Sequence, residues 1–233
     1  MASRKFNTLR DPYDLGWSPC RAKQVEIKDG LTVLVGCNGS GKSTLLHTIK
    51  ADLDAKSIPF MYYDNLVDGG SRSIGDSFQH GHMAFGATLF TSSEGEALTL
   101  NVGKVFSQVR AFLKAGKSDS AKDLWVEIFG DNKTKKIKSK ERWILLDAID
   151  SGLSIDNVVD IKSCFNLILE DAKSFGVDVY VVVVANEYEM VNRVDQCLDV
   201  TTGKYLSFAD YEAFRKFILK GRVKKDRRDG VVE

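Results

Sequence analysis

The sequence Gly36-Cys37-Asn38-Gly39-Ser40-Gly41-Lys42-Ser43 decides the fold. It has the pattern G-x-x-x-x-G-K-S, which is typical of a loop that binds phosphate groups. Residues 31–35, LTVLV, come before it and have the composition of a buried strand, and residues 43–53 have the apolar spacing of a helix. A strand, a glycine-rich loop and a helix thus follow one another in the order that such a loop requires.

Two further apolar segments, residues 143–146 (WILL) and 179–184 (VYVVVV), are also expected to be buried strands. Near-continuous apolar strands separated by long helical segments predict an α/β fold, in which helices flank both faces of a mainly parallel central sheet. The expected helices span residues 98–113, 123–129, 155–175 and 209–219, with Gly176 ending the third, and residues 198–207 are expected to form a hairpin.

The residue types of the loop predict a nucleoside triphosphate site. Glycines let backbone N–H groups approach phosphate oxygens closely, and the start of the following helix adds its positive dipole end. Lys42 would reach the β- and γ-phosphates, Ser43 would ligate Mg²⁺, and Thr44 could hold a neighbouring phosphate. Asp147, directly after the strand 143–146, is the expected acidic partner of the magnesium ion, although an ordinary helix-capping aspartate would look the same.

The motifs resemble those of the ABC ATPase superfamily. Residues 36–44 look like its G-x-N-G-x-G-K-S-T loop, and residues 145–154 (LLDAIDSGLS) are similar to its stretch L-L-D-E-P followed by S-G-L-D. The resemblance implies a P-loop NTPase of the ABC type, closest to the SMC and DNA-repair branch but without a coiled-coil arm, that binds ATP and Mg²⁺. The implied nucleotide-binding residues in this part of the chain are Gly36, Asn38, Gly39, Ser40, Gly41, Lys42, Ser43 and Thr44.

Three other positions take their expected roles from the same resemblance. Ser93 and Gly95, in SSEGE, look like the serine and second glycine of the signature that closes over ATP bound to a second subunit, which implies an ATP-sandwich homodimer. A polar helix N-cap would also explain that stretch. Gln79 could contact magnesium and water, and Asn186 falls where the family has its switch histidine and could hydrogen-bond a phosphate or water.

Ala148 is the main departure, because it falls where the family has the glutamate that polarises the attacking water. Three explanations stay open: Asp150 supplies the carboxylate, ATP is only a ligand, or an engineered change removed the glutamate. Ile149 departs from the family's proline, which favours natural divergence. We expect a slow ATPase in which Lys42, Asp150 and Asn186 are the catalytic candidates, with Asp150 as the base.

Composition restricts the remaining possibilities. The 233 residues carry 33 Lys and Arg against 32 Asp and Glu, so a nucleic-acid surface would have to come from local clusters. Such clusters occur at residues 133–142 and 220–228, which could bind DNA or RNA or could simply be solvated. The four cysteines form no CxxC pair, and the longest apolar run, 177–185, is too short to span a bilayer. We therefore expect a cytoplasmic protein with no direct membrane insertion.

The expected organisation is a single ATPase domain over residues 1–233, with a helical subdomain at about 64–140 and a basic C-terminal tail at 220–233. An ATP-controlled dimer linked to DNA or RNA metabolism is the first hypothesis for function. The alternatives are a non-hydrolysing regulator switched by ATP, the ATP-binding subunit of a transporter, and a P-loop kinase. Ala148 keeps the regulator possible and counts against the transporter subunit, while Ser151-Gly152-Leu153 argues against the kinase.

Overall fold

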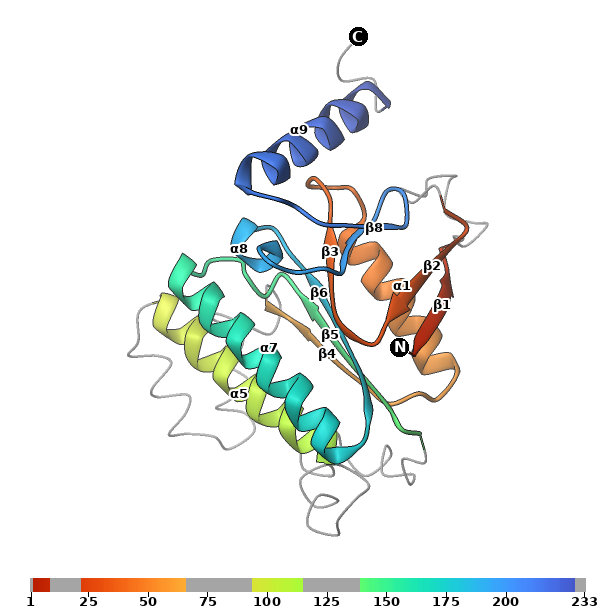
Figure 1. Ribbon diagram of the computed structural model, residues 1–233, viewed down its shortest axis with the longest axis vertical. Helices are drawn as coiled ribbons and strands as arrows, with labels where there is room; N and C mark the ends of the chain where they lie inside the picture. The colour runs from red at the N-terminus through yellow and green to blue at the C-terminus, as the bar shows by residue number, and fades with distance from the viewer. Residues whose placement is uncertain (1, 9–21, 66–93, 115–138, 229–233) are drawn as a thin grey trace.

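The protein is a layered α/β structure with one central sheet (Figure 1). A computed structural model describes residues 2–8, 22–65, 94–114 and 139–228, and within 94–104 it describes the backbone and Gly103 only. The six strands of the sheet have the order β4-β5-β6-β3-β7-β8, and all neighbours are parallel except β7 and β8. The strands are β3 (Gly30–Val35), β4 (Phe60–Asp64), β5 (Glu141–Asp147), β6 (Asp178–Val184), β7 (Cys197–Asp199) and β8 (Lys204–Leu206).

Helices cover both faces of this sheet, as the apolar strands require. On one face lies α1 (Lys42–Ala55), and on the other lie α5 (Glu94–Lys114) and α7 (Ile155–Phe175) (Figure 1). Alternate side chains of one strand enter different cores: Leu34 packs with the α1 side, and Val33 packs with the α7 side. The short α8 (Tyr188–Val191) follows β6, and α9 (Tyr211–Arg228) is the last described helix.

A two-stranded antiparallel ribbon, β1 (Ser3–Asn7) and β2 (Gln24–Lys28), completes the α1 side of the core. Its buried Phe6 meets the edge of the Trp143 ring at 5.2 Å between centroids, and Trp143 stacks on Tyr180 at 4.1 Å. Offset and edge contacts of this kind add to the free energy gained by burying the rings. The ribbon therefore belongs to the same core as the sheet.

The expected α/β class is confirmed, and so are the strands at 31–35, 143–146 and 179–184 and the hairpin at 198–207. The helix at 155–175 ends at Gly176, which adopts a left-handed conformation with φ of 60°. Residues 123–129 lie outside the described residues, as does most of the expected subdomain 64–140. Its described helix α5 packs against α7, with Val109 and Phe112 in the main core.

The C-terminal helix is longer than expected. The sequence predicted a helix over 209–219 followed by a basic tail, whereas residues 220–228 are the second half of α9. Lys and Arg are good helix formers, so a basic run continues a helix readily when no proline interrupts it. Among the residues that the structure describes, none of the helices is long and apolar enough to cross a membrane.

Candidate functional site

The loop 36–43 joins the buried end of β3 to α1 and is held in a tight conformation. Gly39 and Gly41 have φ angles of 71° and 93°, which side chains with a Cβ rarely adopt. Gly36 has no room for a side chain, because an added Cβ would lie 2.3 Å from the Ser40 hydroxyl. These glycines let the loop turn tightly, so that its backbone N–H groups can approach a bound phosphate closely.

The side chain of Lys42 points back into the loop 36–43, to which the residue itself belongs. Its Nζ donates a hydrogen bond of 2.8 Å to the carbonyl oxygen of Gly36, and the residue is only 7% exposed. Burial lowers the pKa of Lys42, and the nearby Asp150 and Asp147 carboxylates oppose that shift. The ammonium group therefore lies inside the loop, with further N–H donors for an anion bound there.

Ser43 and Asp147 meet, as the sequence predicted. The Ser43 hydroxyl donates to Asp147 Oδ1 at 3.1 Å, although 104 residues separate them in the chain. Asp147 is the last residue of β5 and is 5% exposed; burial raises its pKa, the Ser43 hydrogen bond lowers it, and the Asp64 carboxylate raises it. A hydroxyl and a carboxylate oxygen are the hard ligands that Mg²⁺ prefers, so this pair fits a magnesium ion.

No cluster of three His, Cys, Asp or Glu side chains able to hold a metal occurs in the described ranges. A magnesium ion in such a site takes one or two protein ligands and completes its shell with phosphate and water oxygens. The Ser43 and Asp147 pair is therefore sufficient for an ion that arrives with a nucleotide.

A pocket of about 460 Å³ opens over the loop at the carboxyl ends of the strands. This end of an open parallel sheet is where ligands bind. Its lining includes much of the expected site together with two residues that were not expected, His47 and Asp64. The lining residues are Asn38, Gly39, Gly41, Lys42, Ser43, Thr44, His47, Asp64, Asp147, Ala148, Ser151, Val184 and Asn186.

Asp150, the expected base, is not among the lining residues and is 1% exposed. Its Oδ2 accepts hydrogen bonds from the backbone N–H groups of Asn186 at 2.7 Å and Glu187 at 2.8 Å. Burial raises the pKa of the Asp150 carboxyl, and these two hydrogen bonds lower it. In this structure Asp150 holds the turn after β6 and does not face the pocket.

Ala148 and Asn186 both reach the pocket. Ala148, at the position without a glutamate, has a φ of 50° and is 5% exposed, so the chain turns sharply there with a methyl group toward the pocket. Asn186 has its backbone fixed by Asp150, and its Nδ2 donates to the Ser151 hydroxyl at 3.4 Å. The amide side chain thus lines the pocket next to Ser151, and its expected role toward phosphate or water stays a prediction.

Asp64 was missed because its strand was missed. It ends β4 and is paired in register with Asp147 at the end of β5. The Tyr62 hydroxyl contacts Asp64 Oδ2 at 3.5 Å and His47 Nε2 at 2.9 Å, which links both residues. The sequence signal was an apolar and aromatic run ending in an aspartate, FMYYD, which resembles WILLD at 143–147. Gln79 and Ser93 lie outside the described residues, and Gly95 is the second residue of α5.

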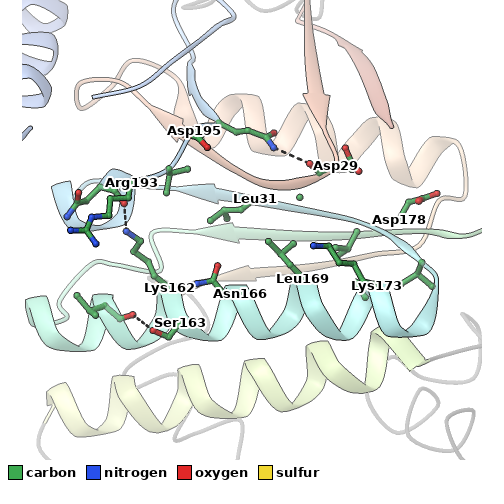
Figure 2. A pocket seen from close by; sticks show the side chains of 18 of the residues that line it. Asp29, Leu31, Lys162, Ser163, Asn166, Leu169, Lys173, Asp178, Arg193 and Asp195 are labelled. Carbon is green, nitrogen blue, oxygen red and sulfur yellow. Dashed lines mark hydrogen bonds between the residues drawn. The ribbon is translucent and has the colours of Figure 1, made fainter. Parts of the chain in front are cut away.

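A second, larger cavity of about 1110 Å³ lies at the amino ends of the strands, between α7 and the starts of β3 and β6 (Figure 2). Lys162 and Lys173 of α7 line one side of it and Asp29, Asp178 and Asp195 line the other, and Lys162 donates to the backbone oxygen of Asn192 (Figure 2). Its mixed charges single out no class of ligand. Its place at the opposite end of the sheet separates it from the loop 36–43.

No protein-family model matches the sequence, and no curated protein matches it either. One solved structure that is similar is described as a nucleotide-free ATP-binding cassette from an ABC transporter. The likeness has a TM-score of 0.43 and 16% sequence identity, and it covers 96% of this chain and 97% of that one. A structural likeness this weak supports no argument about function.

Proposed function

We propose that this protein binds a nucleoside triphosphate, ATP in the first instance, together with Mg²⁺ in the pocket over the loop 36–43. One observation carries the proposal: Lys42 lies inside a glycine-rich loop while Ser43 contacts Asp147 from another strand. Chance turns rich in glycine do not bring a buried lysine, a hydroxyl and a carboxylate to one end of a parallel sheet.

The residues divide the work of binding among themselves. The backbone N–H groups of the loop and the first turn of α1 receive the phosphate oxygens, and Lys42 neutralises part of their charge. Ser43 and Asp147 hold Mg²⁺, which when bound withdraws charge from the phosphate oxygens. Asn186 and Thr44 line the same pocket and can each give a hydrogen bond to a phosphate or to water.

Hydrolysis in this proposal is slow. A methyl group stands at Ala148 where the family has its glutamate, and the Asp150 carboxylate is buried, with its Oδ2 accepting two backbone N–H groups. Among the described residues that line the pocket, Asp64 is the carboxylate other than Asp147, so we assign it the role of orienting water. Asp150 acts indirectly in this proposal, because its hydrogen bonds fix the turn at 186–187. If neither carboxylate supports turnover, the protein is an ATP-switched regulator, the second candidate, which Ala148 favours.

Turnover by two matched variants tests this assignment. We expect Asp64→Asn to abolish the magnesium-dependent release of phosphate from ATP while leaving ATP affinity within about threefold. Asp150→Asn, which keeps an oxygen acceptor for both N–H groups, should retain turnover. Loss of turnover in Asp150→Asn alone would return the role of base to Asp150, and absence of turnover in the unaltered protein would favour the regulator.

The ATP-sandwich homodimer remains part of the proposal on the strength of the sequence alone. It is supported by the likeness of Ser93 and Gly95 to the signature and of residues 145–154 to the family's dimer-contacting stretch. Light scattering with and without ATP and Mg²⁺ measures it directly. We expect the mass to double with ATP, and a mass that stays monomeric at millimolar ATP would remove the sandwich from the proposal.

The link to DNA or RNA rests on the basic segments at 133–142 and 220–228. The second of these is the exposed end of α9, where Arg222 is 72% exposed at its side chain. Binding driven by phosphate contacts weakens steeply with salt, so affinity for a mixed-sequence duplex should be measured at two salt concentrations. Affinity that does not change with salt would argue against this interface.

A further inference from the structure

The C-terminal helix lies directly over the loop 36–43, and the nucleotide and magnesium site proposed above does not use it. Figure 1 shows α9 above the end of β3, where the loop begins. A Cβ added at Gly221 would lie 3.6 Å from the Sγ of Cys37. One turn further along α9, the Nζ of Lys225 is 3.4 Å from the carbonyl oxygen of Asn38.

The two contacts lie on one face of α9, because residues four apart in a helix are neighbours on its surface. They meet consecutive loop residues, since a Cβ added at Gly39 would come within 2.7 Å of the Lys225 Nζ. Glycine at position 221 keeps this face of the helix free of a side chain where it approaches Cys37. The helix therefore brings one lysine to the outer edge of the loop.

Lys225 has donors to spare in this position. An ammonium group carries three N–H donors, and a distance of 3.4 Å to a neutral carbonyl is long for a hydrogen bond. Asn38 and Gly39, which it contacts, both line the nucleotide pocket. Lys225 does not itself line the pocket, so its ammonium group lies just outside a site that is to receive three or four negative charges, next to two residues that do line it.

We propose that Lys225 is a second phosphate-binding cation of this site, beside Lys42, and that the C-terminal helix brings it to the outer edge of the loop at Asn38 and Gly39. The inference rests on the proposed function, because it needs a polyphosphate in the pocket. Bound phosphate attracts the ammonium group away from the weak contact with Asn38. Nucleotide binding thereby fastens α9 to the loop.

A purely structural role would make a different prediction. If Lys225 only anchors α9 to the Asn38 carbonyl, its removal lowers the stability of the free protein and leaves nucleotide affinity unchanged. If Lys225 binds phosphate, its removal weakens the binding of ATP and ADP, has little effect on the binding of adenosine, and lowers the stability of the free protein little.

The test is the affinity of the full chain for a fluorescent ATP analogue and its ADP and adenosine counterparts, with Mg²⁺, at one salt concentration. The variants are Lys225→Ala, Lys225→Arg and the matched control Lys216→Ala, which removes the same charge from an exposed position of the same helix outside the segment 220–228. Thermal unfolding of each variant without nucleotide checks that it folds.

We expect Lys225→Ala to weaken ATP binding by about tenfold, Lys225→Arg to restore most of it, and Lys216→Ala to change it less than twofold. Equal effects of the two alanine variants, or no effect of either, would overturn the inference. A failure of the proposed function has a different signature: the unaltered protein does not bind ATP, or Lys42→Ala binds it as well as the unaltered protein does.

Discussion

A cysteine placed at Gly221 should form a disulfide with the natural Cys37. A Cβ at position 221 would lie 3.8 Å from the Cys37 Cβ, which is the mean separation in disulfide bonds. Cys37 is a free thiol and is 4% exposed, so it is available to a partner that α9 brings to it. We expect Gly221→Cys to cross-link within one chain under mild oxidation.

The size of the effect follows from the length of chain that the bond closes. The bond joins positions 37 and 221 and encloses about 185 residues, for which loss of chain entropy in the unfolded state predicts a gain of about 5 kcal/mol. Engineered bonds often give less because of strain, so we expect the free energy of unfolding to rise by about 2–5 kcal/mol. A cysteine also favours the helix slightly more than glycine does.

Denaturant unfolding with and without a reducing agent measures this gain, and peptide mass mapping identifies the bond. Cys37→Ser in the Gly221→Cys background is the control, because it should abolish both the bond and the gain. An introduced thiol that stays free, or that links only separate chains, would refute the placement of α9 over the loop. The inference about Lys225 would then lose its basis.

Four other predictions concern the pocket and the core. Lys42→Ala should remove the stabilisation by ATP, which at a hundred times the dissociation constant amounts to about 2.7 kcal/mol in the unaltered protein; an unchanged thermal shift would contradict the proposed site. Asp150→Ala should cost about 2–3 kcal/mol in urea unfolding, because two backbone N–H groups lose their acceptor, whereas Asp150→Asn should cost less. Burial raises the pKa of Asp150 above 3.8. The unaltered protein should therefore lose stability relative to Asp150→Asn as pH rises through the folded-state pKa. A difference in the free energy of unfolding between the two proteins that is constant with pH would refute this. Phe165→Ala, at a fully buried position of α7, should cost about 3–5 kcal/mol, and a loss below 1 kcal/mol would show that the core there is loosely packed.

The fold could be predicted where a single physical pattern dominates. Strands buried on both faces, such as residues 179–184, need apolar side chains throughout, so composition alone identifies them. The ribbon strands β1 and β2 were missed because only Phe6, Val25 and Ile27 among their residues are fully buried, and charged residues fill the other face. The end of α9 was missed because a run of lysines suits a helix and a solvated tail equally well.

The candidate site divides in the same way. Lys42, Ser43 and Asp147 could be predicted because a short motif fixes the backbone on which they lie. Asp150 shows where such reasoning ends: its spacing from Asp147 placed it near the pocket, but the direction of its side chain depends on the turn at 186–187. The contact of Lys225 with the loop joins segments 187 residues apart, and no local pattern encodes it.

The hydrogen bonds of Asp150 have a mechanical consequence. The carboxylate of Asp150, which follows β5, accepts hydrogen bonds from the turn that follows β6, and that turn leads directly into α8. Ala148 and Asn186 lie on the two sides of these hydrogen bonds, so we expect them to move together as one wall of the pocket. A partner that displaces α8 would therefore move the Asn186 side of the pocket over the loop 36–43 without contacting a ligand bound there.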